Sequence, residues 1–101
     1  MIARTWHGRV PAGQADAYHA YLLRTGLRDY ASTPGNQGVQ LLRRTEGSVA
    51  HFLIITFWDS YEAIRAFAGD NYDEARYYPE DDEYLLEREP RVVHYDVLST
   101  A

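Results

Sequence analysis

The sequence predicts an α+β fold in which four strands and two helices follow the order βαββαβ. Two segments whose apolar residues recur at helical spacing separate short runs rich in β-branched and aromatic residues. A tight turn at Glu46–Ser48 joins the second and third of these runs directly. The longest run, Val49–Trp58, passes into the second helical segment with almost no linker.

Length and composition bound the class of protein. The chain has 101 residues, which predicts a single domain over residues 1–101, and 46% of them are hydrophobic, as in a folded globule. No apolar run approaches the roughly 20 residues that span a membrane, and the N-terminus lacks the pattern of a signal peptide. There is no Cys, which excludes disulfides and thiolate chemistry. We expect a cytoplasmic protein without a membrane partner.

The charge argues against binding to nucleic acid. The formal net charge is −5, and all ten basic residues are Arg. An acidic chain is a poor partner for nucleic acid, because neutralisation of phosphates supplies most of that affinity. The absence of Lys excludes Schiff-base catalysis. Nine Tyr and two Trp predict a core, an interface or a pocket rich in aromatic rings.

The first half of the chain predicts a strand, a helix and a second strand. Ile2–Val10 alternates as a strand, and Gln14–Ala31 has helical spacing. His19 falls in the middle of the expected apolar stripe, which comprises Ala15, His19, Leu22, Leu23, Gly26, Leu27 and Tyr30. It is either a satisfied histidine or the wall of a cavity. Pro34 ends this segment, and Gly38–Thr45 alternates as the second strand.

The third strand, Val49–Trp58, is apolar on both faces. One face carries Val49, His51, Leu53, Ile55 and Phe57, and the other carries Ala50, Phe52, Ile54, Thr56 and Trp58. A single layer of helices covers only one face of a sheet. We therefore expect the other face to meet a second copy of the chain, in a homodimer.

The second half predicts a helix, an irregular acidic segment and a last strand. Asp59 and Ser60 offer N-caps, and Gly69 offers a C-cap. The stripe of this helix comprises Tyr61, Ile64, Phe67 and Ala68. Helical turns are expected over Tyr72–Tyr78 and Glu80–Glu87, and Arg91–Leu98 is expected to be a strand.

This order of elements is the ferredoxin-like plan, with one four-stranded antiparallel sheet. Right-handed crossovers place the first and third strands at its centre. His7, His51 and Trp58 belong to these two strands.

No local motif identifies a chemistry. The glycines of Pro34–Gly38 form a turn rather than a phosphate loop, and the four His lack local ligand spacing. The acidic run Glu80–Glu83 has the features of a solvated edge, so no metal site is expected. What remains is a possible pocket between sheet and helices, lined by Tyr, Phe, Trp and His. Such a pocket suits oxygenation of a phenol, in which His or Tyr takes a proton and apolar walls desolvate the anion.

The chain resembles the antibiotic biosynthesis monooxygenase family of dimeric α/β barrels. The resemblance lies in ARTWHGRV, PGNQGVQLLRR, FLIITFWDSYEAIRAFAG and VVHYDVL, and its most specific part is the junction Trp58-Asp59-Ser60. It implies ferredoxin-like protomers that pair sheet against sheet. Some members of that family oxidise polycyclic phenols without metal or flavin, and by position and type Trp58 and Tyr72 match their active sites best.

A branch that degrades heme uses an Asn, a Trp and a His. Alignment by eye places His7, Phe67 and Tyr77 at these positions, so all three residues are replaced. The resemblance therefore argues against heme degradation.

These observations predict a cofactor-independent monooxygenase that acts on a small aromatic, phenolic or quinone-like molecule. His7, as proton acceptor or orienting group, is expected to act with Trp58 and Tyr72, and the expected substrate-binding residues are His19, His51, Phe67, Arg76 and Tyr77. Arg76 would stabilise an anionic substrate or oxygen species. The alternatives are a non-catalytic dimeric binding or stress-related protein and, third, a heme-binding protein. Bulky Tyr and Phe side chains that fill the space between sheet and helices would favour the non-catalytic reading.

Overall fold

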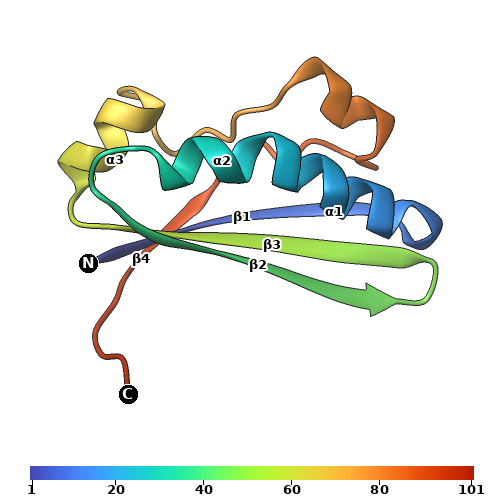
Figure 1. The fold of residues 1–101 in the computed structure, drawn as a ribbon, viewed down its shortest axis with the longest axis horizontal. Coiled ribbons are helices and arrows are strands. Elements are labelled where there is room, and N and C mark those ends of the chain that lie inside the picture. The colour runs from blue at the N-terminus through green and yellow to red at the C-terminus, as the bar shows by residue number, and fades with distance from the viewer.

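The computed structural model describes residues 1–101 and has the predicted ferredoxin-like architecture. Four antiparallel strands form one sheet in the order β2-β3-β1-β4, and the helices lie on one side of it (Figure 1). The strands are β1 (Ile2–Pro11), β2 (Asn36–Glu46), β3 (Val49–Trp58) and β4 (Val93–Asp96). The predicted central positions of the first and third strands are confirmed.

The register of the two central strands decides which side chains face the helices. Trp6 pairs with Ile54, and His7 pairs with Leu53. Because side chains alternate, Arg4, Trp6 and Val10 lie on the face that the helices cover, together with the even-numbered residues of β3. The odd-numbered residues of both strands lie on the other face, and on β3 they are only half buried.

The predicted first helix is interrupted. A short 3₁₀ turn, η1 (Ala12–Gln14), leads into α1 (Ala15–Arg24), and α2 (Gly26–Ala31) follows after a break at Thr25. The Thr25 hydroxyl donates to the carbonyl oxygen of Tyr21 at 2.9 Å. A Thr that bonds back onto the preceding turn bends a helix, and Gly26 after it is a poor helix former.

The buried face of α1 differs from the predicted stripe. Tyr18, Tyr21 and Leu22 are buried, whereas His19 is exposed. The prediction that His19 lies in the apolar face is therefore wrong. Tyr18 packs edge-to-face on Phe52 of β3, with ring centroids 5.1 Å apart, and a tyrosine ring buries more apolar area than an imidazole.

The second of the two predicted helices, which is α3 (Tyr61–Ala68) in the structure, begins and ends as predicted. Ser60 is the N-cap, and its hydroxyl accepts from the backbone N–H of Ala63 at 3.2 Å. Gly69 ends the helix with a φ of 88°. Gly35 lies against the first turn of this helix, since a Cβ at Gly35 would come within 2.5 Å of the Cβ of Ala63. The loop before β2 thereby holds α3 close to the sheet.

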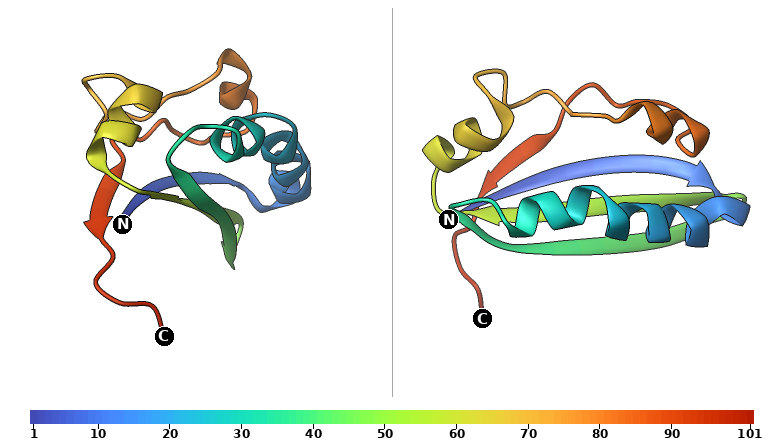
Figure 2. Two further views of the ribbon diagram at one scale, coloured as in Figure 1. Left: turned by 60° about the vertical axis from the view of Figure 1, so that its left-hand side comes forward. Right: turned by 45° about the horizontal axis from the view of Figure 1, so that its top comes forward.

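The acidic segment after α3 runs back along the β1 side of the sheet, beside α1 and α2 (Figure 2). Its only regular element is the 3₁₀ helix η2 (Pro79–Glu83), so the helical turn expected over Tyr72–Tyr78 is wrong. The backbone N–H of Leu86 donates to the carbonyl oxygen of Arg9 at 2.9 Å. The outer edge of β1 is thus covered by β4 along Ile2–Thr5 and touched by this segment at Arg9.

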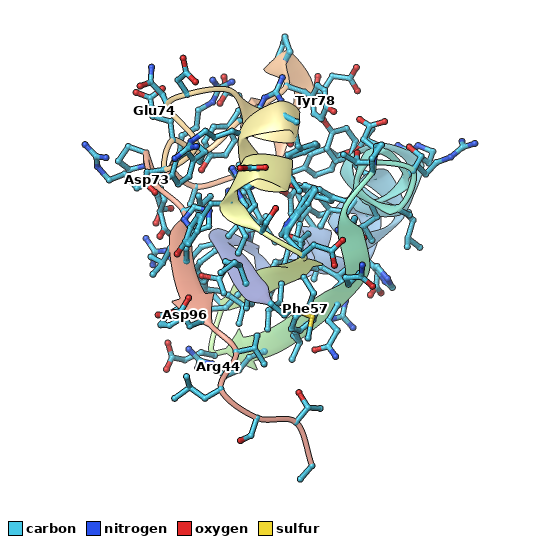
Figure 3. The ribbon with its side chains drawn as sticks, turned by 90° about the vertical axis from the view of Figure 1, so that its left-hand side faces the viewer. Arg44, Phe57, Asp73, Glu74, Tyr78 and Asp96 are labelled. Carbon is cyan, nitrogen blue, oxygen red and sulfur yellow. The ribbon has the colours of Figure 1, made fainter.

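Within the protomer, no helix covers the face of the sheet away from the helices, and only Glu87 and Glu89 reach it, at Arg9 and His7. We call it the open face; the residues that the strand registers place on it are Ala3, Thr5, His7, Arg9, Pro11, Gly38, Gln40, Leu42, Arg44, Glu46, Val49, His51, Leu53, Ile55, Phe57, Val93 and Tyr95. Figure 3 shows Phe57 and Arg44 on this side and Tyr78 on the helical side. Leu42, Val93 and Tyr95 are 44%, 50% and 58% exposed.

Candidate functional site

A pocket lies between the helix-covered face of the sheet and the helices. It has two adjoining parts that share one wall, formed by Gly26, Tyr30, Arg76, Tyr77 and Tyr78. The inner part, of about 50 Å³, reaches the sheet at Arg4, Trp6 and Ile54. The outer part, of about 180 Å³, is bounded by Phe67 and Asp29. An apolar cavity of about 150 Å³ holds benzene, so the outer part has room for one aromatic ring.

Trp6 forms the floor of the inner part and is held by hydrogen bonds. Its indole Nε1 donates to the Tyr77 hydroxyl at 3.1 Å, and that hydroxyl donates to the carbonyl oxygen of Glu89 at 2.6 Å. The indole lies back over Gly8, where a Cβ would come within 2.3 Å of the ring. Gly8 therefore permits the position of Trp6, and the acidic segment fixes it.

The cationic side of the pocket is made by Arg76 and Arg4. The Nη1 of Arg76 donates to the carbonyl oxygen of Phe67 at 2.9 Å, and its guanidinium lies 5.7 Å from the centroid of the Phe67 ring. Arg4 is 3% exposed, and its guanidinium lies 5.9 Å from the same ring. Burial raises the pKa of Tyr30, while the charge of Arg4 opposes that rise. The Tyr30 phenol therefore stays protonated beside two positive charges.

The acidic group of the pocket is Asp81 of η2, which is 5% exposed. Its Oδ2 accepts from the backbone N–H of Tyr78 at 2.6 Å. Burial raises the pKa of this carboxyl, because the charged form loses hydration, and the bond from Tyr78 opposes the rise. A carboxylate with a raised pKa in a pocket has the properties of a general base.

The structure brings three of the eight predicted site residues to the pocket, namely Phe67, Arg76 and Tyr77. Trp58 and Tyr72 lie next to it. Trp58 is fully buried in a small core cluster with Ile2 and Ile64, and its Nε1 donates to the Thr56 hydroxyl at 2.8 Å. Tyr72 packs against His94, with ring centroids 5.3 Å apart, and lines a shallow groove beside β4.

The other three predicted residues lie away from the pocket. His19 is exposed on α1, beside Leu41 and Arg43 of β2. His7 and His51 lie on the open face, so the expectation that His7 faces the aromatic pocket is wrong. Both faces of β3 are apolar, so the alternation of that strand does not say which face the helices cover.

His7 and His51 form a polar chain of their own on the open face. The Nε2 of His7 lies 3.0 Å from the Nδ1 of His51, and the Nδ1 of His7 contacts the carboxylate of Glu89. The Nε2 of His51 lies 3.4 Å from Glu46. These two histidines of the central strands therefore lie side by side. No group of three or more His, Asp or Glu side chains is placed to hold a metal ion.

Sequence reasoning missed Arg4, Trp6, Tyr30 and Asp81 as pocket residues. The alternation of β1 could have found the first two, since it places Arg4 and Trp6 on one face with Ile2 and Val10. An Arg between apolar residues on one face of a central strand is itself unusual, because Arg is rarely buried without a partner. Asp81 was hidden in an acidic run that resembles a solvated edge.

A family model matches most of the chain, and several solved structures share its fold. The family model described as "Antibiotic biosynthesis monooxygenase" matches residues 1–72. Among solved structures, a heme degrader, MhuD from Mycobacterium tuberculosis with two hemes bound in its active site, superposes with a TM-score of 0.68 at 22% identity, covering 100% of this chain and 99% of that one.

Two further structures are antibiotic biosynthesis monooxygenase candidates. The one from Nitrosomonas europaea gives a TM-score of 0.67 at 14% identity and covers 98% of this chain and 100% of its own. The one from Bacillus cereus gives 0.66 at 14% identity and covers 99% and 95%. No curated protein sequence matches the chain significantly. No helix in the structure is long and apolar enough to cross a membrane.

Proposed function

The chain belongs to the antibiotic biosynthesis monooxygenase family, and from this premise we propose that it oxygenates a single-ring phenolic or quinone-like substrate without a bound cofactor. The observation that carries the proposal is the aromatic pocket between sheet and helices, with Arg76 and Asp81 in its walls. Its outer part of about 180 Å³ lies below the roughly 300–1,000 Å³ of sites for larger ligands. A substrate of one ring fills that space and leaves none for a flavin.

In the proposed reaction, Asp81 takes the proton of the phenol. The phenolate then gives one electron to dioxygen, and superoxide joins the ring carbon of the resulting radical. The O–O bond of the peroxide breaks with loss of the ring hydrogen, so one oxygen atom stays as a quinone carbonyl and the other leaves as water. Arg76 stabilises the anionic intermediates, and Phe67 and Tyr77 exclude water from them.

Oxygen uptake tests this proposal. Purified protein is mixed with a panel of phenols and hydroquinones, and dioxygen consumption is followed with an electrode against heat-denatured protein. At least one substrate should be turned over, and Asp81→Asn should cut turnover about 100-fold or more, as expected for loss of a general base. His7→Ala, on the open face, should retain turnover. Asp81→Asn with full activity would remove Asp81 from the mechanism.

A non-catalytic binding protein is the second candidate. The inner part of the pocket has only about 50 Å³ left, because Trp6, Tyr18, Tyr30 and Tyr77 fill the space there. A pocket reduced in this way by its own side chains favours a non-catalytic protein over an enzyme. Ligand binding without oxygen uptake across the whole panel would favour this candidate.

The pocket provides neither a free iron ligand at Tyr77 nor enough space for a heme. Tyr77 stands at the position matched to the heme-ligating His, but its hydroxyl is already bonded to Trp6 and to the carbonyl oxygen of Glu89. The pocket as it stands holds one ring rather than a tetrapyrrole. Titration with hemin should give no Soret band that saturates at one equivalent.

A further inference from the structure

Arg4 is a buried cation without an anion. Its side chain points from β1 into the helix-covered side of the sheet and is 3% exposed. Seven ion pairs form in the protomer, and none of them includes Arg4. Arg is almost never fully buried unless it is paired, since an isolated charge loses its hydration. Burial is the main cause that lowers the pKa of Arg4 from its ordinary value.

The contacts of Arg4 leave its guanidinium incompletely satisfied. Its Nη2 donates to the carbonyl oxygen of Tyr72 over 3.4 Å, a long bond, and the Phe67 ring lies 5.9 Å away. Its Nε is buried and has no acceptor. A buried polar atom without a partner is uncommon in native proteins and requires an explanation.

The side chain that carries this donor lines the pocket. Arg4 lines the inner part with Trp6 and Tyr30, and Arg76 adds a second positive charge where the inner part opens into the outer one. Asp81 lines the same inner part, but it forms no ion pair with Arg4. The charge on Arg4 is therefore available to a ligand.

We propose that this pocket takes a single-ring aromatic ligand that carries a carboxylate or a phenolate, and that Arg4 receives the negative group. The ring lies in the outer part between Phe67 and Tyr30, and its anionic oxygen accepts from the guanidinium of Arg4. The inference rests on the proposed function only in placing the ligand in the same pocket. It holds whether or not the bound molecule is oxygenated.

The buried charge of Arg4 should lower the stability of the protein without a ligand. Replacement of a buried, unpaired charge by an apolar side chain of similar length commonly leaves a protein as stable as before or more stable. The Arg4→Met variant should accordingly fold and unfold at a temperature equal to or above that of the wild type. A residue that lowers the stability of the empty protein is typical of a functional site, where stability is traded against binding.

The experiment measures binding by calorimetry at pH 8 with 4-hydroxybenzoate and its neutral isostere 4-hydroxybenzamide, with 4-nitrophenolate as the phenolate arm. The wild type should bind at least one of the two anions about 10-fold or more tightly than the amide, the range expected for one charge-assisted hydrogen bond. Arg4→Met should abolish this preference, and Arg4→Lys should keep part of it. Arg43→Met, which removes the same charge from exposed β2, should change nothing.

Three outcomes would overturn the inference. They are equal affinity of the wild type for the anions and the amide, no binding of either anion at millimolar concentration, and a preference that survives Arg4→Met but is lost in Arg76→Met. If Arg4→Met does not fold, Arg4→Gln takes its place. Anion binding through Arg4 without oxygen uptake would refute the monooxygenase proposal alone and leave the assignment of Arg4 intact.

Discussion

Arg4 and His94 are paired residues of β1 and β4, and both have a buried nitrogen without a partner. The Nδ1 of His94 lies 3.2 Å from Asp73. Burial lowers the pKa of His94 below its ordinary 6.5, and the positive charge of Arg4 lowers it further, whereas Asp73 opposes both. The two residues are therefore coupled electrostatically, although Arg4 lines the pocket and His94 lines the groove beside β4.

This coupling predicts a pH dependence of stability. As the pH falls below 6.5, His94 gains a proton in the unfolded chain before it does so in the folded one. The unfolded state then binds more protons, so the free energy of unfolding decreases through that window. Urea unfolding at pH 7.5 and 5.5 should show a smaller decrease for His94→Gln than for the wild type. His19→Gln, at an exposed histidine, is the control.

The same pair gives a spectroscopic check on Arg4. The Arg4→Met variant lacks the positive charge that lowers the pKa of His94. This pKa, followed by NMR of the imidazole, should therefore rise. An unchanged value would mean that the charge of Arg4 does not reach His94.

At the level of single residues, the sequence predicted which side chains share a face of a strand. It predicted less well which of the two faces the helices cover. Strand alternation grouped His7 with Arg9 and Trp6 with Arg4 correctly. It did not decide which group the helices cover, because Leu53 and Ile55 make the open face as apolar as Phe52 and Ile54 make the covered one. That choice depends on the path of the chain between strands, which lies outside a local pattern.

The break between α1 and α2 is a feature that helical periodicity alone does not predict. Residues 14–31 have one helical spacing, yet the hydroxyl of Thr25 and the poor helix propensity of Gly26 divide them into α1 and α2. The break places Gly26 in the wall of both parts of the pocket. By contrast, α3 was predicted to within a residue, because Ser60 and Gly69 mark its two ends chemically.

The position of Gly26 predicts a conflict between stability and binding. Gly26→Ala adds a methyl group that makes ordinary contact with the Tyr30 ring at 3.9 Å, and it should stabilise the protein by about 0.5 kcal/mol because Ala is the better helix former. The methyl group also enters the space for the ligand, so affinity for a ring should fall about 10-fold.

Gly13→Ala is the matched control for this change. A Cβ at Gly13 meets no atom within 4 Å, and the residue does not line the pocket. Calorimetry and thermal unfolding of the two variants separate the effects. Undiminished affinity in Gly26→Ala would place the ligand elsewhere.

At the scale of the whole molecule, the fold was predictable from the order of elements, and the open face from the apolar pattern of β3. Leu53, Ile55 and Phe57 are only half buried within one protomer. Leu42 and Val93 extend this apolar surface to both edge strands. Contiguous exposed apolar surface of this kind marks an interaction site, and we propose that a second copy of the chain covers it.

Sedimentation tests the homodimer. The wild type should sediment as a dimer at micromolar concentration, and Leu42→Glu, on the open face, should shift it to monomer. Leu23→Glu is the matched control, because Leu23 on α1 is 51% exposed, close to the 44% of Leu42, but lies on the helical side. A wild-type protein that stays monomeric would contradict the dimer.

The alternation of β1 has a consequence for any attempt to re-engineer or diversify this protein. The proposed ligand pocket and the proposed dimer face use alternate residues of one strand: Arg4 and Trp6 line the pocket, and Thr5 and His7 lie on the open face. A substitution can change one face of β1 without changing the other. Insertion or deletion of one residue within β1 instead moves the side chains beyond it to the opposite face of the sheet. Libraries and natural lineages should therefore vary β1 in composition and keep its length.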